Sequence, residues 1–128
     1  MSDARPLLGV IVSHAAVAQA LVAAVAVITG IEGALVPVSN DGCGTEALSE
    51  RLRVAVGTGP AVLFVDLPGG SCLASSARYA RQHADIAVVT GVNLAMLLDF
   101  VFHRDVPPGE AARRAADAGG KAIRVTAA

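Results

Sequence analysis

Two segments place residues that could do chemistry directly after apolar stretches. His14 follows Gly-Val-Ile-Val-Ser, and Asp66 follows Leu-Phe-Val and precedes the turn that contains Gly69, Gly70 and Ser71. A neutral imidazole has one nitrogen that can attack phosphorus and a second nitrogen that a carboxylate can orient. Glycines let the backbone approach an anion, and a helix that follows them offers unpaired N–H groups. Together these residues indicate phosphoryl transfer to a histidine.

Each of these features also has a structural explanation. A histidine at the end of a strand is often incidental, an aspartate can cap a helix, and a Gly-Gly-Ser turn is often only a turn. The functional interpretation therefore depends on whether His14, Asp66 and residues 69–71 lie together.

The elements that would position these residues alternate along the chain. Short β-branched apolar stretches predict strands, and alanine-rich stretches with helical spacing predict helices. The predicted strands are Leu7–Val12, Ala34–Val38, Ala61–Asp66 and Ile86–Val89, with a terminal strand at Lys121–Val125. The predicted helices are Ala15–Ile28, Thr45–Val56, Ser71–Gln82, Leu94–His103 and Glu110–Ala118.

This alternation predicts an α/β fold, a doubly wound three-layer sandwich around a mostly parallel sheet. In such sheets the first and third strands are often neighbours, which would bring Asp66 within reach of His14, and ligands bind beyond the carboxyl ends of the strands. The last strand, Lys121–Val125, has little chain before it for a parallel crossover. We expect it to pair antiparallel at an edge, even on a neighbouring subunit.

The length of 128 residues favours one compact domain over residues 1–128. The formal net charge is −1, without a cluster of Lys and Arg, so neither nucleic acid nor an anionic membrane surface is indicated as a partner. The N-terminal segment lacks the pattern of a secretory signal, and the two cysteines suit a reducing cytoplasmic setting. Their spacing indicates no metal site, and we expect the chemistry to need neither metal nor cofactor.

Three segments resemble one known family. GVIVSHAAVAQAL resembles the opening of mannose-type enzyme IIA domains of the sugar phosphotransferase system, where a strand leads through Ser or Thr to the phosphorylated histidine. VLFVDLPGGSCLASSAR is similar to that family's Asp and Gly-Gly-Ser signature, and VVTGVNLAMLLDFVFHRD to its Gly-Val-Asn loop and the helix after it. The segments occur in family order and cover nearly the whole chain.

The resemblance implies a bacterial phosphotransferase that carries a phosphoryl group on His14. Asp66 would be the hydrogen-bond partner of His14, and Ser71 with the Gly69 and Gly70 backbone would contact the phosphoryl oxygens. The mouth of the site would be lined by Ser13, Gly91, Val92 and Asn93. The implied partners are HPr as donor and an enzyme IIB component as acceptor, with the membrane involved only through a permease. The resemblance also implies a homodimer that exchanges the final strand.

One departure from the family pattern leaves a second function open. Leu67-Pro68 replaces the polar-then-aromatic pair common in transporter members. The alternative is a regulatory module whose phosphorylation state controls a partner without sugar transport. The related phosphoryl donor subunit of dihydroxyacetone kinases fits less well, since its Met-Gly-Ser after the Asp is missing. A receiver domain lacks its acidic pair after the first strand.

Structural roles are expected for the remaining reactive side chains. His83 and His103 lie near predicted helix ends, where a polar or cationic side chain suits exposed carbonyls. We expect Cys72 to be a small packed residue, with a reactive thiol at a helix N-terminus as the alternative. Cys43 is expected to fill a loop.

Overall fold

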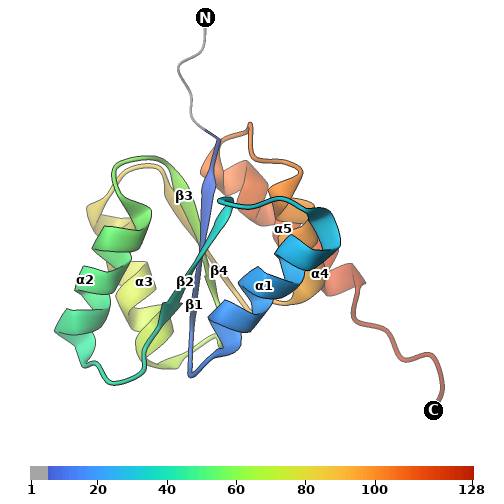
Figure 1. Ribbon diagram of the computed structural model, residues 1–128, viewed down its shortest axis with the longest axis horizontal. Helices are drawn as coiled ribbons and strands as arrows, with labels where there is room; N and C mark the ends of the chain where they lie inside the picture. Colours follow the sequence, from blue (N-terminus) through green and yellow to red (C-terminus); the bar gives the residue numbers. More distant parts are fainter. Residues whose placement is uncertain (1–5) are drawn as a thin grey trace, which may run out of the picture.

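The computed structural model describes residues 6–128, in which strands and helices alternate as predicted (Figure 1). The strands are β1 (Leu8–Ser13), β2 (Leu35–Ser39), β3 (Ala61–Val65) and β4 (Ile86–Thr90). The helices are α1 (Val17–Thr29), α2 (Thr45–Val56), α3 (Gly70–Gln82), α4 (Leu94–Val101) and α5 (Pro108–Lys121). In this part of the chain, no helix is long and apolar enough to cross a membrane.

Within residues 6–128 the four strands form one parallel sheet in the order β2-β1-β3-β4. The order reverses at β1, because the chain goes first to one side of that strand and then crosses to the other. The carboxyl ends of β1 and β3 are therefore neighbours, and Val12 lies opposite Val65 in the register. The predicted adjacency of the first and third strands is confirmed.

Helices cover both faces of the sheet, as a doubly wound fold requires (Figure 1). On one face, Ile11 and Phe64 pack with residues of α1, α4 and α5, and the Phe64 ring meets the Phe100 ring edge to face at 5.0 Å. On the other face, Val10 and Leu63 pack with residues of α2 and α3. β1 and β3 are buried on both faces, which explains their nearly continuous apolar sequences.

The C-terminal segment differs from its prediction. α5 continues through Gly119 and Gly120 to Lys121, so the two glycines do not end the helix as expected. Residues 123–128 form neither helix nor strand and extend away from the body of the chain (Figure 1). Ile123 and Val125 are 77% and 82% exposed. The chain does not add this segment to its own sheet, and exchange with a second subunit stays a prediction.

Candidate functional site

The two predicted reactive residues meet where β1 and β3 end. His14 directly follows β1, and Asp66 directly follows β3. The two strands are hydrogen-bonded neighbours, and the Asp66 N–H continues this pairing by donating to the Val12 carbonyl at 3.2 Å. The sheet thus brings together side chains that are 52 residues apart in sequence.

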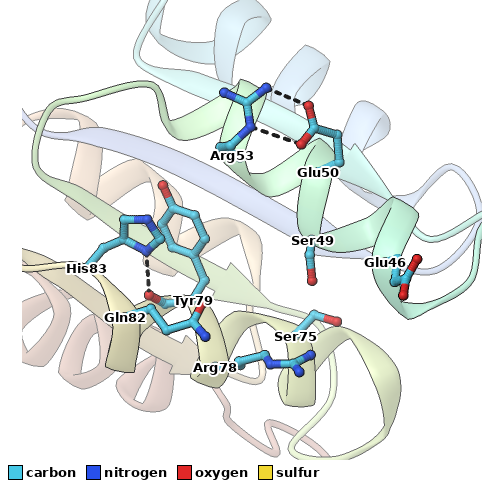
Figure 2. Close-up of a pocket in the computed structure, with 9 residues that line it drawn as sticks. All are labelled: Glu46, Ser49, Glu50, Arg53, Ser75, Arg78, Tyr79, Gln82 and His83. Atoms are coloured by element: carbon cyan, nitrogen blue, oxygen red, sulfur yellow. Dashed lines mark hydrogen bonds and ion pairs between the residues drawn. The ribbon is translucent and has the colours of Figure 1, made fainter.

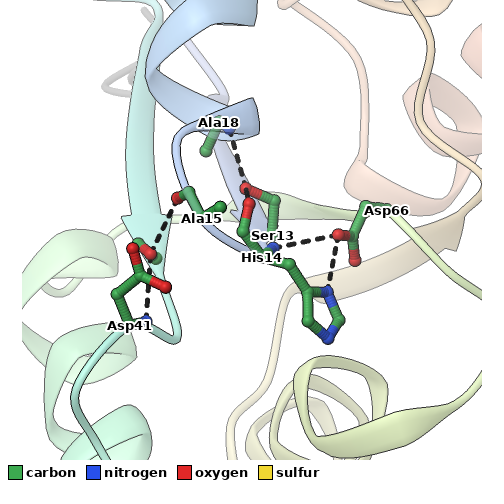
Figure 3. A network of polar contacts seen from close by, with 7 residues as sticks. Ser13, His14, Ala15, Ala18, Asp41 and Asp66 are labelled. Atoms are coloured by element: carbon green, nitrogen blue, oxygen red, sulfur yellow. Dashed lines mark hydrogen bonds and ion pairs between the residues drawn. The ribbon is translucent and has the colours of Figure 1, made fainter.

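Asp66 holds His14 by two contacts to the same oxygen (Figure 3). Asp66 Oδ2 lies 2.8 Å from His14 Nδ1 and accepts the His14 backbone N–H at 2.9 Å. An ionised carboxylate only accepts, so it fixes the neutral ring in the tautomer with the proton on Nδ1. Nε2 points away from Asp66 and has no hydrogen-bond partner among the described residues. The His14 side chain is 44% exposed, which leaves Nε2 open to a reactant.

The charge state of Asp66 suits this role. Partial burial raises the pKa of the carboxyl, but the hydrogen bonds from the His14 ring and backbone and the electrostatic interaction with His14 together outweigh this effect. The net pKa lies below its usual value, and the carboxylate is ionised at neutral pH. Asp66 Oδ1 is buried and has no hydrogen-bond partner within residues 6–128. The nearby Leu67 N–H assists the lowering of the pKa but does not reach hydrogen-bond geometry to Oδ1.

The turn that presents His14 is held on both sides (Figure 3). Ser13 is fully buried, and its Oγ accepts the Ala18 N–H at 2.7 Å, so it caps the start of α1. Ala15 has φ +50°, a left-handed conformation that costs a non-glycine residue roughly 1–2 kcal/mol. The Ser39 hydroxyl donates to the Ala15 carbonyl at 2.9 Å and ties the turn to β2. Ser13 therefore has a positioning role, and its predicted place at the mouth of the site stays a prediction.

The residues of the predicted anion site lie at the N-terminus of α3. α3 begins at Gly70, whose φ of +86° is a conformation that glycine adopts without strain. The N-cap residue Gly69 provides no side-chain hydrogen bond to the first N–H groups of the helix. Gly69, Gly70 and Ser71 are all exposed. These free donors and the positive end of the helix dipole favour a bound anion, although contact with a phosphoryl group stays a prediction.

The loop between β4 and α4, residues 91–93, has a structural role as well as its predicted place at the mouth of the site. The Val92 N–H donates to the Val65 carbonyl at 3.0 Å and holds this loop against the end of β3, and Gly91 has φ +75°. Asn93 caps α4, because its Oδ1 accepts the Met96 N–H at 3.0 Å. Its Nδ2 donates to the Gly119 carbonyl of α5, also at 3.0 Å. The Asn93 amide thus joins two helices, and its contribution to the mouth stays a prediction.

Cys72 directly follows Ser71 of the predicted anion site, and its thiol lies close to the pair formed by His14 and Asp66. Cys72 lies in the first turn of α3 and is fully buried. Its thiol and single ligand atoms of His14 and Asp66 all lie within 4.8 Å of one another. Spacing alone could not reveal that these three side chains meet, because His14 is far in sequence from Asp66 and Cys72. Burial and the negative charge of Asp66 raise the pKa of the Cys72 thiol, which argues against a reactive thiolate.

The other histidines have the structural roles expected of them. His83 Nδ1 lies 3.0 Å from the Tyr79 carbonyl at the end of α3, and the two rings stack at 4.0 Å. His103 Nδ1 lies 2.8 Å from the Asp99 carbonyl at the end of α4. Arg114 of α5 contacts His103 Nε2 at 2.8 Å. Both histidines therefore satisfy helix-end carbonyls.

A groove of about 350 Å³ between α2 and α3 lies apart from His14 (Figure 2). Its lining carries both charges, with Glu46 and Glu50 on α2, Arg53 on α2 and Arg78 on α3. Glu50 Oε1 accepts Arg53 Nε at 2.9 Å. The groove shares no lining residue with the predicted site, so its charge and position do not connect it with phosphoryl chemistry.

The fold and site define an α/β protein with a histidine–carboxylate pair at the carboxyl edge of its sheet. The family model described as PTS system fructose IIA component, EIIA-man, matches residues 9–116, and the chain therefore belongs to this family. The resemblance stated from the sequence is confirmed. No curated protein sequence is significantly similar to the chain.

Solved structures with the same fold include further phosphotransferase components. The component EIIA from Streptococcus agalactiae is 20% identical, with a TM-score of 0.86 over 93% of this chain and 96% of that one. The mannose/sorbose-specific IIA subunit from Enterococcus faecalis is 21% identical, with a TM-score of 0.85 over 97% of both chains. A sigma-54 interaction domain protein from Enterococcus faecalis is 12% identical, with a TM-score of 0.76 over 96% of both. At these identities, the likeness supports the fold alone.

Proposed function

We propose that the chain is a phosphoryl carrier of the sugar phosphotransferase system, with His14 Nε2 as the atom that is phosphorylated. The observation that carries this proposal is the contact between His14 Nδ1 and Asp66 Oδ2 at 2.8 Å, which leaves Nε2 free and exposed. Membership of the IIA family supports it. The donor would be the phosphohistidine of HPr, and the acceptor a histidine of an enzyme IIB component.

The transfer is an in-line displacement in each direction. The Nε2 lone pair attacks phosphorus, the phosphorus–nitrogen bond of the donor breaks, and its electron pair returns to the donor imidazole. Phosphorylated His14 carries a positive charge on its ring, which Asp66 stabilises by accepting a hydrogen bond from Nδ1–H. The N–H groups at the start of α3 would hold the phosphoryl oxygens in place. Positioning and charge stabilisation provide most of the catalysis in phosphoryl transfer.

A direct test uses enzyme I, HPr and labelled phosphoenolpyruvate. We expect wild type to gain acid-labile, base-stable label at one site. His14→Gln should gain none, whereas His103→Gln should be labelled like wild type. Equal labelling of His14→Gln and wild type would refute the proposal.

A regulatory function is the second candidate, because an exposed apolar residue adjoins the site. Leu67 directly follows Asp66 and is 54% exposed, so a partner that docks at His14 would meet it. This surface departs from that of transporter members, although the phosphorylation chemistry would be the same. Neighbouring genes distinguish the two functions: a complete set of B, C and D components supports transport, and their absence supports regulation.

A further inference from the structure

Three side chains at the site combine the donor types that zinc prefers. They are the imidazole of His14, the carboxylate of Asp66 and the thiol of Cys72, with one ligand atom of each within 4.8 Å of the others. Zn²⁺ is bound in proteins by nitrogen, oxygen and thiolate sulfur, and sites with three protein ligands leave a fourth position for water or a reactant. From this group we infer that the chain binds one Zn²⁺ between His14, Asp66 and Cys72.

Two features of Asp66 and His14 make this position suitable. Asp66 Oδ1 is buried and lacks a hydrogen-bond partner in the described part of the chain, so its lone pairs are available. His14 Nδ1 is the ring nitrogen that faces Asp66, at 2.8 Å from Oδ2. The His14 side chain is 44% exposed, so solvent reaches one side of the ring.

The geometry requires a modest contraction around the ion. With zinc–nitrogen and zinc–oxygen bonds of about 2.1 Å and a zinc–sulfur bond of about 2.3 Å, ligand atoms of a tetrahedral site lie roughly 3.5 Å apart. The ligand atoms of the three side chains now lie up to 4.8 Å apart, so they must approach one another by about 1 Å to bind the ion. Cys72 lies in the first turn of α3, two residues after Gly70, whose φ of +86° is a conformation that glycine adopts without strain.

Binding changes the protonation of two ligands. The Cys72 sulfur loses its proton and binds Zn²⁺ as a thiolate, so one proton is released. His14 binds through Nδ1, and its ring proton passes through solvent to Nε2. Asp66 is already ionised and binds through Oδ1. The Nε2 lone pair is then occupied by a proton.

The consequence concerns the phosphoryl site and depends on the proposed function. A His14 ring with zinc on Nδ1 and a proton on Nε2 has no lone pair left to attack phosphorus. Zinc and the phosphoryl group would therefore exclude each other, and the chain would act as a phosphoryl carrier that free zinc inhibits reversibly.

Zinc binding can be measured without any phosphotransferase component. Chelator-treated protein is titrated with Zn²⁺ against a chromophoric competitor, for wild type, Cys72→Ser and the matched control Cys43→Ser. We expect one Zn²⁺ per wild-type chain, and a loss of affinity of about 10–100-fold or more in Cys72→Ser. Cys43→Ser should bind within twofold of wild type. Equal affinity in Cys72→Ser and wild type would overturn the inference.

Co²⁺ provides a readout that does not require the Cys72 variant to fold. In Cys43→Ser, Cys72 is the remaining thiol of the chain. A thiolate-to-cobalt charge-transfer band in this variant supports the site, and its absence contradicts it. A final arm adds Zn²⁺ and then a chelator to the HPr labelling reaction, where we expect loss and recovery of label. If zinc binds but wild type is never labelled, the phosphocarrier proposal fails while the metal site stands.

Discussion

At His14 the two ring nitrogens have different environments, and this difference defines the chemistry of the site. Nδ1 faces the carboxylate of Asp66, and Nε2 faces outward. Asp66→Asn retains the size of the side chain but removes its charge. We expect the rate of phosphoryl transfer to His14 to fall on the order of 100-fold, because the charge on the phosphorylated ring loses its partner. Rapid-quench labelling measures this rate.

The matched control for that substitution is Asp99→Asn. Asp99 also lies beside a histidine, with its Oδ1 at 3.5 Å from His103 Nδ1, but this pair lies at the C-terminal end of α4. Labelling of Asp99→Asn should stay within twofold of wild type. A similar loss in both variants would mean that the effect arises from general destabilisation.

The pH dependence of folding also reports on Asp66. The pKa of its carboxyl is lower in the folded chain than the ordinary value of 3.8. As the pH falls, Asp66 therefore takes up a proton at a higher pH in the unfolded chain than in the folded chain. Its ionised carboxylate stabilises the folded chain above the unfolded pKa, and this stabilisation is lost as the pH falls through the folded pKa. We expect the difference in free energy of unfolding between wild type and Asp66→Asn to shrink from pH 7 to pH 3. Urea titrations at both values test this, and a difference that grows on acidification would contradict it.

Among the elements, α4 and α5 pack so closely that a side chain added at one glycine between them should change the stability of the fold. A Cβ added at Gly119 would lie 3.0 Å from Asn93 Oδ1 and 3.0 Å from Met96 Cε, whereas one added at Gly120 would meet nothing within 4 Å. Gly119→Ala should therefore destabilise the fold by about 1–3 kcal/mol. Gly120→Ala should stabilise it by about 0.5–1 kcal/mol, since alanine favours a helix interior.

Chemical denaturation of the two alanine variants gives the comparison directly. Opposite signs are expected for the two changes in the free energy of unfolding. If both substitutions stabilise the chain, α5 does not pack against Asn93 as described.

Most of the sheet and its helices could be predicted because apolar periodicity and glycine boundaries are local signals. The same signals predicted His14 and Asp66 at strand ends, and the parallel order of β1 and β3 then places them together. Three features were beyond that reasoning. Cys72 joins the site through tertiary packing, Asn93 joins α4 to α5, and α5 continues through Gly119-Gly120 because packing outweighs the weak helix propensity of glycine.

At the scale of the whole molecule, the exposed C-terminal segment is the feature that a single chain leaves unexplained. Ile123 and Val125 are apolar and largely exposed, and they follow a helix that ends at Lys121. We propose that this segment adds to the sheet of a second copy, so that the protein is a homodimer. A chain that ends at Lys121 should then sediment as a monomer, and wild type as a dimer. The proposal is wrong if both have the same mass in solution.

The central claim is that His14 Nε2 carries the phosphoryl group. The most direct measurement is a ¹H–¹⁵N correlation spectrum of the ¹⁵N-labelled imidazole after incubation with enzyme I, HPr and phosphoenolpyruvate. We predict coupling of phosphorus to Nε2 of His14, with Nδ1 still protonated and bound to Asp66. Coupling to Nδ1, or an unmodified His14 beside a phosphorylated second residue, would contradict it.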